Sequence, residues 1–152
     1  MNKLASILIG SLFSLSAVAA EQSGTAEEAR AMLERAVAAL KADKIKALEA
    51  FNSESGGFRS HGIYVYCSTA DGTFTAHPTL KEKLQKGQNM KDVKGANGEE
   101  IGKEMLAKAK EGHIATINYM FKRPGSDKPM PRVGLVTKVG DQLCGTAYNV
   151  QP

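Results

Sequence analysis

Histidine is the side chain best suited to move a proton or hold a transition metal near neutral pH, and this chain has three: His61, His77 and His113. They lie far apart, and none has another His, Asp or Glu at the spacing of a known ligand pattern. Because zinc needs three or four convergent ligands, we expect no metal site. His77 ends a predicted strand just before a polar loop. It either donates a hydrogen bond to an anion in a pocket or bonds to the backbone of that loop.

The two cysteines, Cys67 and Cys144, can form only one intramolecular pair. Cys67 ends the first predicted strand and Cys144 lies in the last, and these strands can be neighbours in an antiparallel sheet. An exported protein meets an oxidising compartment, so we expect a disulfide. Closing a loop of 77 residues would stabilise the fold by about 4–5 kcal/mol. The alternative is a pair of buried, reduced thiols that act as small apolar residues.

Motifs for covalent catalysis are missing from the sequence. There is no Gly-x-Ser-x-Gly, His-Glu-x-x-His, Cys-x-x-Cys or phosphate-cradling glycine motif. The carboxylates lie on predicted helix faces and in turns, where solvation accounts for them. We therefore expect neither an enzyme nor a bound cofactor, and an acid/base pair assembled by folding is the alternative that sequence leaves open.

Polar side chains on the predicted strands are the better candidates for a binding site. The planar fork of Arg132 suits a carboxylate, and tyrosine hydroxyls can complete its coordination. Alternation along the first strand places Tyr64 and Tyr66 on one face, opposite Val65 and Cys67. Each tyrosine could instead lie at the edge of the core with a solvated hydroxyl. The predicted ligand-binding residues are Tyr66, His77, Tyr119, Arg132 and Tyr148.

The first twenty residues have the pattern of an export signal. Lys3 gives a positive start, an apolar run follows over residues 4–15, and small residues lead up to Ala20. We expect cleavage near Ala20, which would leave residues 21–152 as a single periplasmic or secreted domain. An uncleaved anchor is the alternative.

The charge distribution argues against nucleic-acid binding. The chain has 152 residues and a formal net charge of +4, and loss of Lys3 with the signal would leave +3. Apolar and acidic residues separate Lys81, Lys83 and Lys86, and no aromatic side chains are interleaved with them for base stacking. We therefore expect solvated lysines and no nucleic-acid partner.

Hydrophobic periodicity predicts an α+β domain, a long N-terminal helix packed on a five-stranded, mostly antiparallel sheet. The helical region covers 25–51, begins with a capping box of Thr25 and Glu28, and bends or breaks within 41–46. The sheet, with a helical crossover, covers 62–150. Its predicted parts are a hairpin over 62–78 with a first strand at 63–66 and a turn at Asp71-Gly72, a polar loop with short helical turns over 79–98, a helix over 99–110, and strands over 114–121, 133–139 and 143–150.

A series of short motifs runs along the chain in a fixed order. Its members are Phe51-Asn52, Tyr64 to Tyr66, Asp71-Gly72, His77-Pro78, Gly87, Asn89, Asp92, Gly98 and Lys128-Pro129. Together they resemble the single Cache domain family, type 2, over nearly all of residues 21–152.

The resemblance implies a PAS-like fold in which the His-Pro loop closes a small pocket in front of the sheet. It implies extracytoplasmic sensing of a small molecule, an organic acid or an amine, by a protein that signals to a membrane sensor kinase or chemoreceptor. Because the sequence ends at Pro152, we expect a stand-alone secreted member with a separate membrane partner. The alternative function is a structural or interaction subunit with the same fold and a filled pocket.

Overall fold

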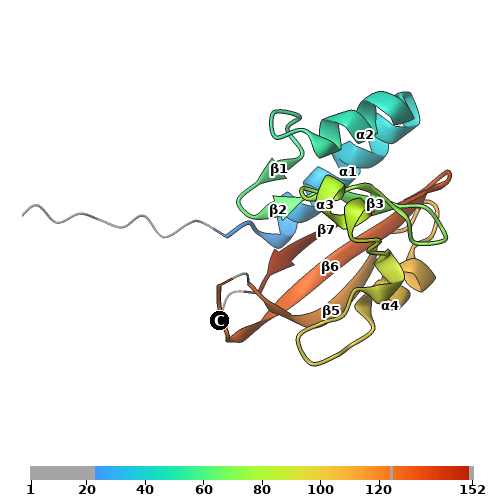
Figure 1. The fold of residues 1–152 in the computed structure, drawn as a ribbon. Coiled ribbons are helices and arrows are strands. Elements are labelled where there is room, and N and C mark those ends of the chain that lie inside the picture. Colours follow the sequence, from blue (N-terminus) through green and yellow to red (C-terminus); the bar gives the residue numbers. More distant parts are fainter. Residues whose placement is uncertain (1–22, 124, 151–152) are drawn as a thin grey trace, which may run out of the picture.

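The computed structural model describes residues 23–123 and 125–150, so the predicted export signal lies outside the described residues. One five-stranded antiparallel sheet carries helices on its two faces (Figure 1). The predicted α+β architecture, with an N-terminal helix packed against this sheet, is confirmed. No helix in the described part of the chain is long and apolar enough to cross a membrane.

The sheet has the strand order β4-β3-β7-β6-β5, and each neighbouring pair is antiparallel. Its strands are β3 (Tyr66–Ser68), β4 (Phe74–Ala76), β5 (Ala115–Lys122), β6 (Pro129–Val139) and β7 (Gln142–Asn149). The first and last of these along the chain, β3 and β7, are neighbours, as we expected. Gly140, whose φ of 58° lies in the left-handed region, closes the tight turn between β6 and β7.

The strand predicted at 63–66 is wrong as one continuous element, because it is divided at Val65, which belongs to neither of two ladders. Residues on either side of a turn form a separate two-stranded ladder, β1 (Arg59–Ser60) and β2 (Ile63–Tyr64). His61 and Gly62 have φ values of 49° and 75°, and this pair of left-handed residues closes the turn. The chain then enters β3 at Tyr66, and the predicted turn at Asp71-Gly72 leads into β4.

The N-terminal helical region consists of two helices, α1 (Ala26–Ala42) and α2 (Lys44–Asn52). The predicted capping box is present: the Glu28 N–H donates to the Thr25 hydroxyl, and the Thr25 N–H donates to the Glu28 carboxylate at 2.7 Å. Asp43 separates the helices, and its side chain accepts from the Lys46 N–H at 3.1 Å to cap α2. The predicted break within 41–46 is therefore confirmed.

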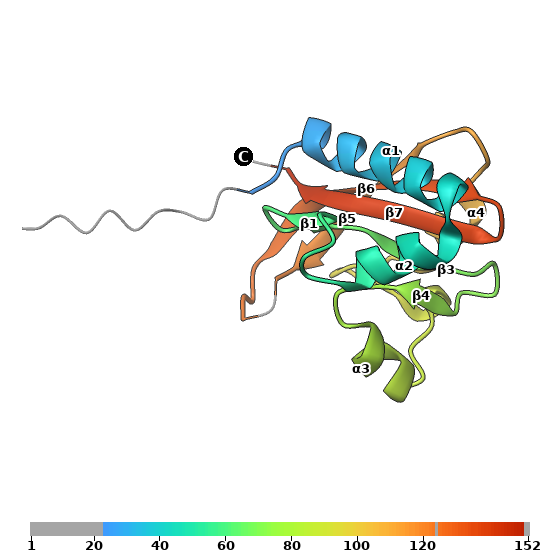
Figure 2. The same cartoon turned by 90° about the horizontal axis from the view of Figure 1, so that it is seen from above.

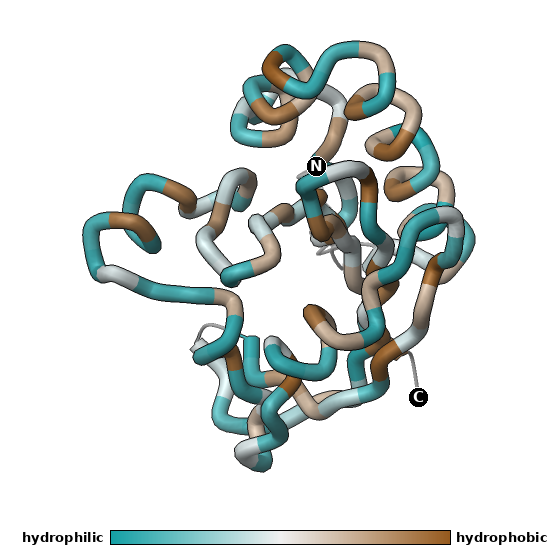
Figure 3. Tube along the Cα trace, turned by 90° about the vertical axis from the view of Figure 1, so that its right-hand side faces the viewer, coloured by the Kyte–Doolittle hydropathy of each residue, from teal (hydrophilic) through white to brown (hydrophobic). Residues whose placement is uncertain are grey.

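One stripe of α1 is buried against the sheet. Ala29, Leu33 and Ala36 are fully buried and Leu40 nearly so, at the three- and four-residue spacing of one helix face. Figure 2 shows α1 lying along β6 and β7. Figure 3 shows hydrophobic and hydrophilic residues alternating along the helical turns, as this one-sided burial requires.

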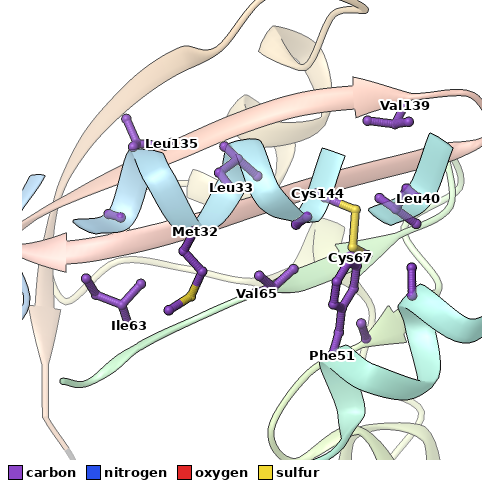
Figure 4. Packing of buried hydrophobic residues seen from close by; sticks show 14 of the residues in the cluster. Met32, Leu33, Leu40, Phe51, Ile63, Val65, Cys67, Leu135, Val139 and Cys144 are labelled. Carbon is purple, nitrogen blue, oxygen red and sulfur yellow. A yellow bond between two sulfur atoms is a disulfide. The ribbon is translucent and has the colours of Figure 1, made fainter. Parts of the chain in front are cut away.

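The core beneath α1 contains the disulfide. Cys67 on β3 and Cys144 on β7 are directly opposed, with their Cα atoms 4.1 Å apart, and are joined by an S–S bond. Both are buried among side chains of α1, α2 and the sheet, and the bridge lies beside Phe51 in Figure 4. The disulfide expected from the sequence is present, and it ties together two strands that are far apart in the chain.

The opposite face of the sheet is covered by three short helices. They are α3 (Leu80–Gln85), the 3₁₀ helix η1 (Met90–Asp92) and α4 (Ile101–Lys108). We call residues 79–98, which include α3 and η1, the flap. The Met90 N–H donates to the Gly72 carbonyl at 2.8 Å and the Asn89 side chain donates to the Asp71 carbonyl at 3.2 Å, so η1 is fixed to the β3–β4 turn. By contrast, α3 has no buried residue.

Candidate functional site

A cavity of about 240 Å³ lies between the flap, α4 and the sheet. Four of the five predicted ligand-binding residues line it: Tyr66, His77, Tyr119 and Arg132. They come from β3, the end of β4, β5 and β6, so four separate segments of the chain meet at one place. A cavity of this size suits a small metabolite rather than a drug-sized molecule.

Tyr148, the fifth predicted residue, lies on the other face of the sheet. It packs against the core cluster beneath α1, whereas its neighbour Ala147 lines the cavity. Thr146, two residues earlier in β7, also points to the α1 side and donates to the Ala29 carbonyl at 2.9 Å. Strand alternation therefore removes Tyr148 from the candidate site.

Arg132 is the most unusual residue of the cavity. It sits on β6, opposite Tyr119 of β5, and is only 7% exposed. Its guanidinium carbon lies 4.5 Å from the centroid of the Phe121 ring, an arrangement favoured by cation–π attraction. Its Nε is buried without a hydrogen-bond partner, and none of the ion pairs between described residues involves it. A buried guanidinium without a counter-ion is costly, and an anion in the cavity would relieve that cost.

Two tyrosine hydroxyls approach the same region. Burial raises the pKa of Tyr66 well above its usual value and raises the pKa of Tyr119 to about 12. Both phenols are therefore protonated at neutral pH and can donate hydrogen bonds to a ligand. The Tyr66 hydroxyl has a weak partner, the Met105 sulfur at 3.5 Å, which a better acceptor could replace.

A glycine makes room for Tyr66. A Cβ atom at Gly145, in the middle of β7, would overlap the ring and hydroxyl of Tyr66 and the Leu135 carbonyl. Close approach of a side chain to bare backbone is one of the reasons for a glycine within a strand. This glycine leaves the space on β7 that the Tyr66 ring and hydroxyl occupy.

His77 both bonds to the flap and lines the cavity. Its Nδ1 accepts a hydrogen bond from the Thr79 backbone N–H at 3.1 Å, which places the proton of the neutral ring on Nε2. Burial, with Lys83 and Arg59 nearby, lowers its pKa to about 3. The two roles foreseen for His77 are thus compatible, because a neutral ring anchored through Nδ1 keeps Nε2–H free to donate.

Several lining residues were not predicted as ligand-binding. Lys83 of α3 is half-buried, with its Nζ 4.9 Å from the centroid of the Phe74 ring, although we expected a solvated lysine. Lys94 and the apolar Met90 and Ile101 also line the cavity. Their positions depend on how the flap folds back over the sheet, and no local sequence pattern predicts the path of the flap.

The cavity is cationic. Arg132, Lys83 and Lys94 line it, and no carboxylate from the described residues does. Within the described residues no group of three or more His, Cys, Asp or Glu side chains could hold a metal ion. A wider hollow of about 490 Å³ on α2 is open to solvent and has no basic side chain in its lining. The cavity beneath the flap is therefore the better candidate for ligand binding.

Comparison with known proteins gives the family. The sequence profile of the Cache domain matches residues 29–142, most of the chain, and the chain therefore belongs to the Cache domain family. No curated protein sequence matches it significantly.

Solved structures agree with the fold. A methyl-accepting chemotaxis protein from Vibrio parahaemolyticus is 18% identical, with a TM-score of 0.62 over 82% of this chain and 88% of that one. The periplasmic sensor domain of a chemotaxis protein is 21% identical, with a TM-score of 0.57 over 82% and 90%. A Cache chemosensory domain described for its recognition of carboxylic acids is 20% identical, with a TM-score of 0.55 over 82% and 88%. At these identities the likeness establishes a shared fold.

Proposed function

We propose that this protein is an extracytoplasmic sensory domain that binds a small organic anion, a carboxylate, in the cavity beneath the flap. The observation that carries the proposal is Arg132, a nearly buried cation with an unpartnered Nε at the wall of a cavity. A carboxylate would accept from the guanidinium fork and from the phenols of Tyr66 and Tyr119. These hydrogen bonds are stronger in a desolvated cavity than in water.

The lining also indicates which small molecules are disfavoured. An amino acid presents an ammonium group, whose strongest partners are carboxylates and carbonyl oxygens. In the described part of the chain only cations and neutral groups line the cavity, so an ammonium group would meet repulsion. We therefore favour a simple organic acid over an amine or an amino acid as the ligand.

Location and signalling follow from the same proposal. The first twenty residues favour export, and a disulfide is typical of compartments outside the cytoplasm. We infer a single Cache domain, type 2, that acts in the periplasm or is secreted. Its partner in signalling would be a separate membrane sensor kinase or chemoreceptor, a class to which two of the similar structures belong by name.

A binding role fits the cavity better than a catalytic or purely structural one. No carboxylate among the described residues lines it that could act as a general base, and the nearest histidine is held neutral through its bond to the flap. A structural subunit would be expected to fill the space with apolar side chains, yet an arginine, a histidine and three tyrosines line it.

The test is a thermal-shift screen of the purified protein against carboxylates, amines and amino acids at millimolar concentration. We expect carboxylates alone to raise the midpoint, since a ligand that binds only the folded state stabilises it. Arg132→Lys keeps the charge but loses the planar fork, and it should abolish most of the shift while circular dichroism shows an intact fold. A screen in which no carboxylate raises the midpoint would refute the proposal.

A further inference from the structure

The cavity has a second cation on its opposite wall. Lys83 is the one residue of α3 that lines it. Lys83 and Leu80 are half-buried, whereas the other four residues of α3 are exposed. Burial lowers the pKa of Lys83, and no ion pair among the described residues includes it. Its neighbour Glu82 is paired with Lys86 at 2.6 Å instead. Lys83 therefore has only a long contact with the Gln88 side-chain oxygen, at 3.4 Å, and the face of Phe74.

A row of aromatic rings, here called the aromatic wall, leads from Lys83 to Tyr66. The Tyr66 and Tyr64 rings lie 6.4 Å apart, Tyr64 and His77 lie 5.3 Å apart, and His77 and Phe74 lie 5.7 Å apart, all edge to face. Lys83 rests over Phe74 at one end of this wall. Arg132 lies opposite Tyr119 on the neighbouring strand, and Gly134, two residues further along β6, approaches both Tyr119 and the Tyr66 hydroxyl, so Arg132 lies near the Tyr66 end of the row. The cavity thus has a half-buried cation on the flap and a buried one on the sheet, with aromatic rings between them, while Lys94, the third cation of the lining, is exposed.

This arrangement matches a molecule with a negative group at each end of a short hydrocarbon stem. We propose that the ligand is a short, unbranched dicarboxylate, with one carboxylate on Arg132 and the other on Lys83. The inference rests on the proposed function and adds the class of acid. The stem would lie along the aromatic wall, and His77 Nε2–H would be left to donate to an oxygen near the Lys83 end.

Lys83 also gives the ligand a way to move the flap. No residue of α3 is buried, and its hydrophobic packing on the core cluster comes from Leu80, whereas η1 is fixed to the β3–β4 turn by two hydrogen bonds. A carboxylate that attracts Lys83 would draw α3 toward the sheet and close the cavity. A monocarboxylate held by Arg132 alone would leave α3 where it is.

Calorimetric titration of the purified protein with matched acids tests this. The dicarboxylates malonate, succinate, glutarate and adipate are compared with the monocarboxylates propionate, butyrate, pentanoate and hexanoate. We expect at least one dicarboxylate to bind about tenfold or more tightly than the monocarboxylate of equal length, as two charged contacts should exceed one.

Two lysine variants locate the second contact. Lys83→Met should reduce the ratio of dicarboxylate to monocarboxylate affinity toward one. Lys81→Met removes the same charge from an exposed position of the same helix that does not line the cavity, and it should preserve the ratio.

Three results would overturn the inference. One is equal affinity for the two classes of acid, which would leave the proposed anion sensor intact. Another is an equal effect of the two lysine variants, which would indicate long-range attraction rather than a contact. The third is the absence of binding by either class, which would end both proposals together.

Discussion

Opening the Cys67–Cys144 disulfide should remove a large part of the stability of this domain. The bridge closes a loop of 77 residues. The chain-entropy relation assigns such a loop about 15 cal/mol/K, or about 4.5 kcal/mol at room temperature. Single domains unfold with about 5–15 kcal/mol, so the reduced protein would be marginal. The effect bears on function because the bridge holds β3, which carries Tyr66, against β7.

Urea unfolding followed by circular dichroism measures this, as the chain has no tryptophan for fluorescence. Oxidised protein, reduced protein and the double variant Cys67→Ala/Cys144→Ala are compared. The reduced protein keeps both sulfur atoms, so its loss of unfolding free energy measures the effect of loop closure alone. The double variant also loses packing at two positions that are at most 1% exposed, and it should be less stable than the reduced protein.

The reasoning fails if reduction lowers the unfolding free energy by less than about 1 kcal/mol. Such a result would mean that the unfolded chain already keeps the two strands together, so that the bridge has little entropy to remove. A change in the dependence on urea concentration would reveal this residual structure independently.

Three further substitutions test individual features. His77 should make the protein acid-sensitive: its pKa is 6.5 when unfolded and about 3 when folded, so the unfolded state binds more protons between these values and stability falls as pH drops from 6.5. His77→Gln should flatten that fall by at most about 1.4 kcal/mol per pH unit in urea titrations, and parallel curves for the two proteins would contradict the buried neutral ring. Gly145→Ala should destabilise by about 1–3 kcal/mol and displace Tyr66, seen as a lower thermal midpoint with weaker carboxylate binding. Asp43→Ala removes the cap of α2 and should cost about 1 kcal/mol without affecting binding, so a change in affinity would argue against a local effect.

The alternation of side chains along the strands shows how much of the site could be predicted from the sequence. Tyr66 and Cys67 are adjacent on β3, so they face opposite sides of the sheet. A bridge to Cys67 puts Cys144 on the α1 side, and Tyr148, four residues later, shares that side. The expected disulfide, followed to this consequence, would have excluded Tyr148 from a site that contains Tyr66.

Other features depend on contacts that no local pattern encodes. The turn between β1 and β2 places His61 in a left-handed conformation, which is uncommon for a residue other than glycine. Lys83 reaches the cavity because the flap folds back and η1 bonds to the β3–β4 turn. The lysines of the flap look alike in sequence, and only their tertiary positions separate Lys83 from Lys81. The capping box and the helix break, by contrast, are local features and were predictable.

The central claim is that the cavity beneath the flap holds a small carboxylate against Arg132. A crystal structure of the protein grown with the carboxylate that gives the largest thermal shift tests it most directly. The account predicts ligand density in that cavity, with carboxylate oxygens within hydrogen-bond distance of the Arg132 guanidinium. A cavity filled by its own side chains, or a ligand bound elsewhere with Arg132 untouched, would contradict it.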